Sequence, residues 1–126
     1  MKPGAKGIRR LIHAGRYSWQ GLKAAWKSEA AIRQEVLALV VLLPIALLVP
    51  VSAAEKALLT FSAILLLVVE LINSAIEAVV DRLGTEYHEL SGKAKDIGSA
   101  AVLVTLLAAA TVWVIILLPL LRQYLN

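Results

Sequence analysis

Long apolar runs dominate this chain of 126 residues, and polar residues gather between them. Three segments, 36–54, 57–80 and 97–121, are each long enough to cross a bilayer, which takes about 20 helical residues. The first and third contain no charged residue, and the second contains only Glu70 and Glu77. Because a helix satisfies its own backbone groups in lipid, these segments predict three transmembrane helices. The expected fold class is an all-α polytopic membrane protein.

Residues 6–27 follow a different pattern, that of an amphipathic helix. On a helical wheel, one arc between about 300° and 40° holds its apolar and aromatic residues, which are Ile8, Leu11, Ile12, Trp19, Leu22 and Trp26. Basic side chains occupy the arc from about 60° to 200°. This pattern is typical of a helix that lies in the membrane interface and faces anionic lipid or nucleotide. A plain electrostatic membrane anchor is the alternative.

Residues 28–35 join the amphipathic segment to the first span. Glu29 and Arg33 are four residues apart, so they could pair on one helix face. Glu29 is also expected at about the depth of the lower end of the second span. Its partner there would be Glu77.

The charge distribution predicts the orientation of the spans. Of the 13 Lys and Arg, eight precede the first span, three lie in the loop 82–96, and only Lys56 and Arg122 lie on the other side. The positive-inside rule therefore places the amino terminus and this loop in the cytoplasm, and the carboxyl terminus outside. The net charge of +4 thus indicates membrane orientation and not a nucleic-acid partner. No repeat or linker divides the chain, so we expect one membrane domain over 1–126.

A line of polar side chains follows one face of the second span. At 100° per residue, Glu70, Ser74, Glu77 and Asp81 lie within about 60° of one another, with Asn73 beside them. Holding a carboxylate at membrane depth costs about 2.5–3.5 kcal/mol, which favours a functional role. Carboxylates together with water and phosphate oxygens suit Mg²⁺, and the deeper Glu70 could take a proton from a lipid hydroxyl. In the alternative interpretation both glutamates are structural, protonated or hydrogen-bonded across helices.

The polar loop 82–96 carries no known nucleotide-binding signature. Gly92-Lys93 is the nearest match to a phosphate-binding loop, but Ala94 follows it and the spacing from Gly84 is wrong. Any nucleotide chemistry must therefore use an unrelated site. The chain has no cysteine and only two histidines, which excludes thiolate metal sites and leaves too few ligands for a His-only metal site.

Two stretches resemble the prokaryotic diacylglycerol kinases. YSWQGLKAAWKSEAAIRQE at 17–35 is similar to the amino-terminal signature of that family, and VELINSAIEAVVDRLGTEYHELSGKAKDIGSAAVL at 69–103 is similar to its catalytic stretch. Together they cover almost half of the chain. The first span, the outer turn and the end of the third span match only in character.

The resemblance implies a homotrimer in the bacterial inner membrane, with an interfacial helix and three spans in each protomer. A three-helix protomer is too thin to enclose a site alone, so active sites shared between subunits are expected. The implied reaction transfers the γ-phosphoryl group of Mg-ATP to the hydroxyl of diacylglycerol and yields phosphatidate. With this orientation the carboxyl terminus would be periplasmic.

The resemblance also implies residue roles. Glu70 would be the general base, and Glu29 and Glu77 would hold the divalent ion. On the same helix face we expect Asn73 and Asp81 to be supporting residues, with Asp81 in a structural role. Contacts to ATP are implied for Arg10, Tyr17, Glu29, Glu77, Glu86, Tyr87, His88, Lys95 and Asp96. Contacts to the lipid substrate are implied for Arg10, Ala14, Ser18, Trp19, Ala31, Arg33, Gln34, Glu35, Glu70 and Ser99.

Three other functions compete with this one. An undecaprenol kinase would use the same site on a different lipid, although the full signature at 17–35 favours diacylglycerol. A small multidrug or ion transporter could also hold a membrane glutamate, but such proteins usually have four spans and little charged loop. A non-catalytic regulatory subunit would show no turnover as a purified chain.

Overall fold

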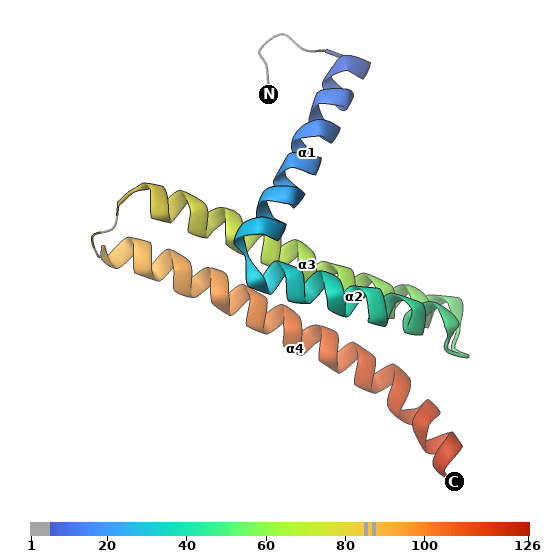
Figure 1. The fold of residues 1–126 in the computed structure, drawn as a ribbon. Helices are drawn as coiled ribbons and strands as arrows, with labels where there is room; N and C mark the ends of the chain where they lie inside the picture. The colour runs from blue at the N-terminus through green and yellow to red at the C-terminus, as the bar shows by residue number, and fades with distance from the viewer. Residues whose placement is uncertain (1–5, 85, 87) are drawn as a thin grey trace.

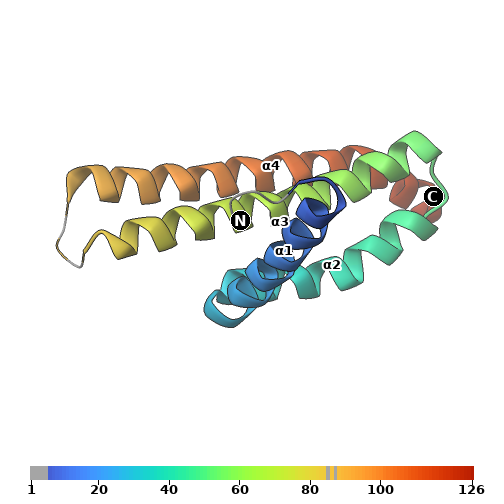
Figure 2. The same cartoon turned by 90° about the horizontal axis from the view of Figure 1, so that it is seen from above.

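The structure is a computed structural model that describes residues 6–84, 86 and 88–126. These residues form α1 (Ile8–Ser28), α2 (Ala30–Leu48), α3 (Ala53–Arg82) and α4 (Glu89–Leu125). Helices α2, α3 and α4 run alongside one another as a bundle, and α1 projects away from it (Figures 1 and 2). The all-helical fold class is therefore confirmed. Each of the three bundle helices is long and apolar enough to cross a membrane, as the hydrophobic runs predict.

The helical conformation is interrupted between α1 and α2 at Glu29, which has an extended backbone (φ −120°, ψ 112°). Arg33 stabilises this break, because its Nη1 donates to the carbonyl oxygens of Trp26 (2.6 Å) and Lys27 (3.2 Å). The last carbonyls of a helix have no partner within the helix, and here a guanidinium supplies one. The suggested pairing of Glu29 with Arg33 does not form. The break removes Glu29 from the helix face that carries Arg33.

The turn between α2 and α3 is short and well capped. Helix α2 ends at Leu48, earlier than the expected 54, because Pro50 favours an extended residue before it and Val49 has ψ 146°. Ser52 then caps α3: its Oγ accepts from Glu55 N (3.2 Å), while Glu55 Oε1 accepts from Ser52 N (3.1 Å). This reciprocal pair begins α3 at Ala53, four residues before the predicted span.

All three bundle helices meet in a small core near this turn. Ala46, Leu59 and Ile116 are buried together there. The indole Nε1 of Trp113 on α4 also donates to the carbonyl oxygen of Leu59 on α3 (3.2 Å). This contact ties α4 to α3 at the end of the bundle away from the α3–α4 connection.

At the opposite end, the connection between α3 and α4 is shorter than the predicted loop 82–96. Helix α3 ends at Arg82, and Gly84 follows with φ 140°, a backbone conformation that favours glycine. The His88 Nδ1 accepts from Leu90 N (3.1 Å) and caps α4, which therefore begins at Glu89. Residues 89–96 are helical because this cap and an acidic first turn satisfy the amino-terminal end of a helix.

Helix α4 is longer than a bilayer needs. Its 37 residues span about 55 Å, whereas the hydrocarbon core is about 30 Å thick. Because the apolar part of α4 begins at 97, the polar turns 89–96 extend beyond the membrane-spanning part. They run beside the last turns of α3, where the polar face of that helix ends.

Candidate active site

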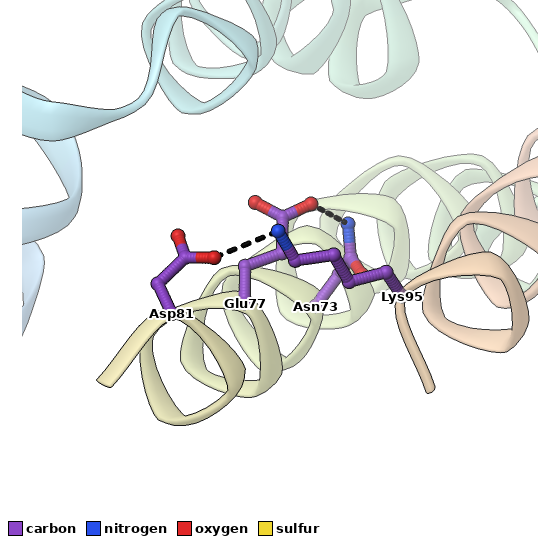
Figure 3. Close-up of polar contacts among 4 residues, drawn as sticks. All are labelled: Asn73, Glu77, Asp81 and Lys95. Carbon is purple, nitrogen blue, oxygen red and sulfur yellow. Dashed lines mark hydrogen bonds and ion pairs between the residues drawn. The ribbon is translucent and has the colours of Figure 1, made fainter. Parts of the chain in front are cut away.

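The polar face predicted for the second span exists on α3. Asn73 is buried, Glu70 and Glu77 are half-buried, and Asp81 is exposed at the end of the helix. Figure 3 shows Asn73, Glu77 and Asp81 following one another along α3, with Lys95 reaching over from α4. From Asn73 onward, the exposure of these side chains thus increases toward the end of α3 that leads into the α4 connection.

Two polar contacts organise this face. The Asn73 Nδ2 donates to Glu77 Oε1 (3.3 Å). The Lys95 Nζ lies 2.7 Å from Asp81 Oδ1, and both side chains are substantially exposed, at 45% and 65%. Lys95 precedes the apolar part of α4, and the hydrogen bond to Asp81 together with the charge of that carboxylate raises the pKa of its ammonium group. Lys95 is thus held as a cation beside the carboxylates.

A pocket of about 430 Å³ lies where α3, the connection and α4 meet. It is lined by Glu86, His88 and Lys95, three of the residues that the resemblance assigns to ATP, and by Asp81. The reversal of the chain from α3 into α4 brings these residues together, although they are apart in the sequence. Tyr87, assigned to the same role, lies outside the described residues.

A groove of about 520 Å³ separates α1 from α3. Ser18 and Glu29 line one wall, and Ser74 lines the other among small residues of α3. Ser74 is one helical turn from both Glu70 and Glu77, on the same face. Glu29 and Glu77 lie within electrostatic range of Glu70, and so does Glu35 on α2. The fold therefore brings three glutamates, Glu29, Glu35 and Glu77, within electrostatic range of Glu70, and of these four Glu29 lines the groove.

A second groove along α1, of about 630 Å³, is mainly apolar and is lined by Trp19, Trp26 and the stems of Lys23 and Lys27. Other assigned residues line neither the pocket nor the two grooves: Arg10, Ala14, Tyr17, Ala31, Arg33, Gln34, Glu35, Glu70, Asn73, Glu77, Asp96 and Ser99. Most of them are exposed on this single chain, and Arg33 is engaged in capping α1.

The donor set suits a divalent ion that arrives with phosphate. No group of three or more His, Asp or Glu able to hold a metal by itself occurs within the described part of the chain. Mg²⁺, however, usually binds through one or two carboxylates, substrate phosphates and water. Glu77 keeps a second carboxylate oxygen beyond the one bonded to Asn73, and Glu29 faces the adjoining groove. These residues fit an ion shared with ATP.

Sequence reasoning missed two features of the site. The pairing of Asp81 with Lys95 was not expected, although an acid at the end of one helix and a base at the start of its antiparallel neighbour are a usable signal. The burial of Asn73 against α4 at Gly98 was missed as well. A lone glycine inside an apolar helix could have indicated that close approach.

Comparison with known proteins shows the family to which this chain is related. Residues 16–117 match the family model described as prokaryotic diacylglycerol kinase. The chain is 52% identical over 117 residues to diacylglycerol kinase of Escherichia coli, covering 93% of this chain and 96% of that protein. The chain is 50% identical over 115 residues to diacylglycerol kinase of Pseudomonas aeruginosa, covering 91% of this chain and 94% of that protein. It is 46% identical over 107 residues to diacylglycerol kinase of Haemophilus influenzae, covering 85% of this chain and 91% of that protein.

Proposed function

Because this chain belongs to the prokaryotic diacylglycerol kinase family and is therefore a lipid kinase, we propose that the glutamates around the α1–α3 groove carry out its phosphoryl transfer. The relatives described above are all diacylglycerol kinases, and they give no support to an undecaprenol kinase. Membership in an enzyme family also removes the transporter and the regulatory subunit from consideration.

Glu70 acts as the general base in this proposal. It accepts the proton of the diacylglycerol hydroxyl as that oxygen bonds to the γ-phosphorus of ATP and the bond to the leaving ADP oxygen breaks. Phosphoryl transfer depends mainly on positioning and charge neutralisation, so no covalent enzyme intermediate is required. The position of Glu70 supports this role, since it lies deeper along α3 than Glu77 and within electrostatic range of three other glutamates.

Nucleotide binds at the more exposed end of α3. Glu77 and Glu29 would hold Mg²⁺, which when bound neutralises phosphate charge. Lys95 adds a positive charge, and Glu86, Tyr87, His88 and Asp96 contact the nucleotide. The pocket shared by Glu86, His88 and Lys95 supports this arrangement. From α1, Arg10 and Tyr17 complete the ATP contacts.

Diacylglycerol reaches the groove from the membrane. Its contacts are Ala14, Ser18, Trp19, Ala31, Arg33, Gln34, Glu35 and Ser99, together with Arg10 and Glu70. Helix α1 lies in the interface, with the amino terminus and the α3–α4 connection in the cytoplasm and the carboxyl terminus in the periplasm of a bacterial inner membrane. The excess of Lys and Arg on the α1 side supports this orientation.

The active enzyme is a homotrimer whose sites are completed by neighbouring subunits. Many large apolar side chains of α2, α3 and α4 are exposed on the single chain, more than half exposed at Val40, Phe61, Val79 and Val104. Several assigned lipid contacts, such as Ala31 and Ser99, also face outward. Lipid or another protomer must cover these surfaces.

The main support for this function is that Glu29 and Glu77 lie within electrostatic range of Glu70. The variant Glu70→Gln tests the role of Glu70 as general base. The amide is nearly isosteric but cannot accept the proton, so turnover of diacylglycerol in mixed micelles should fall by about 10²–10⁴-fold with the fold and oligomer intact. A rate above about a tenth of wild type, far outside the usual share of a general base, would contradict the assignment.

Glu77→Gln is the companion variant for the metal role. It should raise the Mg²⁺ concentration needed for half-maximal rate, because one oxygen ligand is lost. An unchanged Mg²⁺ dependence argues against Glu77 as a ligand. Diacylglycerol and undecaprenol offered side by side test the lipid class, and preferential phosphorylation of undecaprenol would overturn it.

A further inference from the structure

Asn73 is held from two sides. Its side chain is only 9% exposed, and its Nδ2 donates to Glu77 Oε1 (Figure 3). Its Oδ1 is also buried and has no hydrogen-bond partner within the described residues. A buried amide oxygen without a partner is uncommon, so the neighbour that covers it matters.

Gly98 on α4 is that neighbour. Gly98 is itself buried, and a Cβ added there would strike Asn73 Oδ1 and come within 3.3 Å of Asn73 Cγ. In glycine the same direction is taken by a Cα–H bond, which therefore points at Oδ1 as a weak C–H···O contact. Any residue with a side chain at position 98 would push the Asn73 amide aside or separate α4 from α3.

We infer that Gly98 is a positioning residue that clamps the Asn73 amide, so that Nδ2 faces Glu77. If the amide were reversed, its oxygen would face the Glu77 carboxylate and repel it, because neither group can then donate. Helix α4 thus orients a carboxylate of α3 through Asn73. Gly98 reaches Glu77 only through this amide. The inference rests on the proposed function, in which Glu77 holds Mg-ATP, and deepens it.

Other glycines of the chain show no such close approach. No neighbouring atom lies within 4 Å of a Cβ built at Gly15, Gly21 or Gly84. Gly15 also lies inside a helix, so Gly15→Ala makes the same chemical change in open space. It is the matched control for Gly98→Ala.

The kinetic test uses the full-length enzyme in mixed micelles. Gly98→Ala should raise the KM for Mg-ATP roughly 10- to 100-fold, the usual effect of losing a partner that orients a ligand. The KM for diacylglycerol should stay unchanged, and Gly15→Ala should alter neither constant. An unchanged KM for Mg-ATP in folded Gly98→Ala protein would overturn the inference.

A double-mutant cycle separates the clamp from simple helix packing. Asn73→Ala removes the side chain that the new methyl group would strike, so adding Gly98→Ala to it should raise the KM no further. Additive effects would mean that Gly98 acts only by packing α4 on α3, and the inference would fail. If Gly98→Ala does not fold, Asn73→Leu keeps a side chain branched at Cγ but has no donor. A normal KM for Mg-ATP in that variant would also overturn the inference.

A spectroscopic measurement makes the result independent of activity. Asn73 and Asn126 are the only asparagines in the chain, so selective ¹⁵N-asparagine labelling yields signals from just two side-chain amide groups in NMR spectra. Gly98→Ala and Glu77→Gln should both shift the Asn73 signal and leave that of Asn126 in place. If the signal does not move in Gly98→Ala, the clamp is absent. If it shifts but Glu77→Gln leaves Mg²⁺ dependence normal, the clamp stands and the proposed metal role of Glu77 fails.

Discussion

Asp81 at the end of α3 and Lys95 in the second turn of α4 form an ion pair with an N···O distance of 2.7 Å. The pair lies in the pocket that also contains Glu86 and His88, within the region proposed for ATP. Lys95 also lies within electrostatic range of Glu77. Asp81 therefore holds the cation that the proposed function assigns to phosphate.

Asp81→Asn should lower the KM for Mg-ATP severalfold. The substitution removes both the competitor for Lys95 and a negative charge that repels the phosphates. The unfolding midpoint should change little, because exposed ion pairs contribute little to stability. Steady-state kinetics with varied Mg-ATP, together with thermal unfolding, would measure both effects.

Glu89→Gln is the matched control, since it removes one exposed negative charge from the first turn of α4 without touching the pair. An equal fall of KM in both variants would mean that general charge, and not release of Lys95, is responsible. The pKa of Lys95 is raised, so its ammonium group is fully charged below the ordinary lysine pKa of about 10.4 and loses its proton only as pH rises through the raised value. Between pH 6 and 9 the ratio of the two enzymes' KM values should consequently stay constant.

Arg33→Ala should loosen the junction between α1 and α2. The substitution deprives the carbonyls of Trp26 and Lys27 of their donor, a loss of about 1 kcal/mol for a partly exposed contact. Backbone amides near residues 25–29 should then exchange with deuterium about fivefold faster. Turnover should fall as well, because this junction positions Glu29 and the α1 wall of the groove.

Arg9→Ala is the control for the Arg33 variant, since it removes an exposed basic residue from α1 away from the junction. Exchange at 25–29 should remain at the wild-type rate in this protein. Faster exchange in both variants would indicate that lost positive charge, and not the carbonyl cap, loosens α1.

Ser52→Ala should destabilise the start of α3 without affecting catalysis. Loss of an amino-terminal cap typically costs about 1 kcal/mol, so the unfolding midpoint in detergent should fall. Kinetic constants should not change, because the cap lies at the opposite end of α3 from the polar face.

Thr60→Val provides a comparison within the same helix. It removes a buried hydroxyl that has no hydrogen-bond partner in the described residues, so it should not lower stability. A similar fall of the unfolding midpoint in both variants would mean that the capping box makes no specific contribution to stability.

Periodicity predicted the polar face of α3 correctly, because residues three and four apart on a helix must lie on one side. Glu70, Ser74, Glu77 and Asp81 required no tertiary information to be grouped. Element boundaries were less accurate. The cap at His88 extends α4 into the expected loop, and the break at Glu29 separates it from Arg33.

The sequence by itself determined the three apolar helices, the polar face of α3 and the family, because length, hydrophobicity and residue identity are local properties. Only the tertiary structure decided which side chains meet: Lys95 with Asp81, and Gly98 with Asn73. Those contacts depend on the register between α3 and α4 along their axes and on which faces the two helices turn toward each other. No pattern within either helix contains that register, since it is set by the connection at 83–88 and by the packing of both helices.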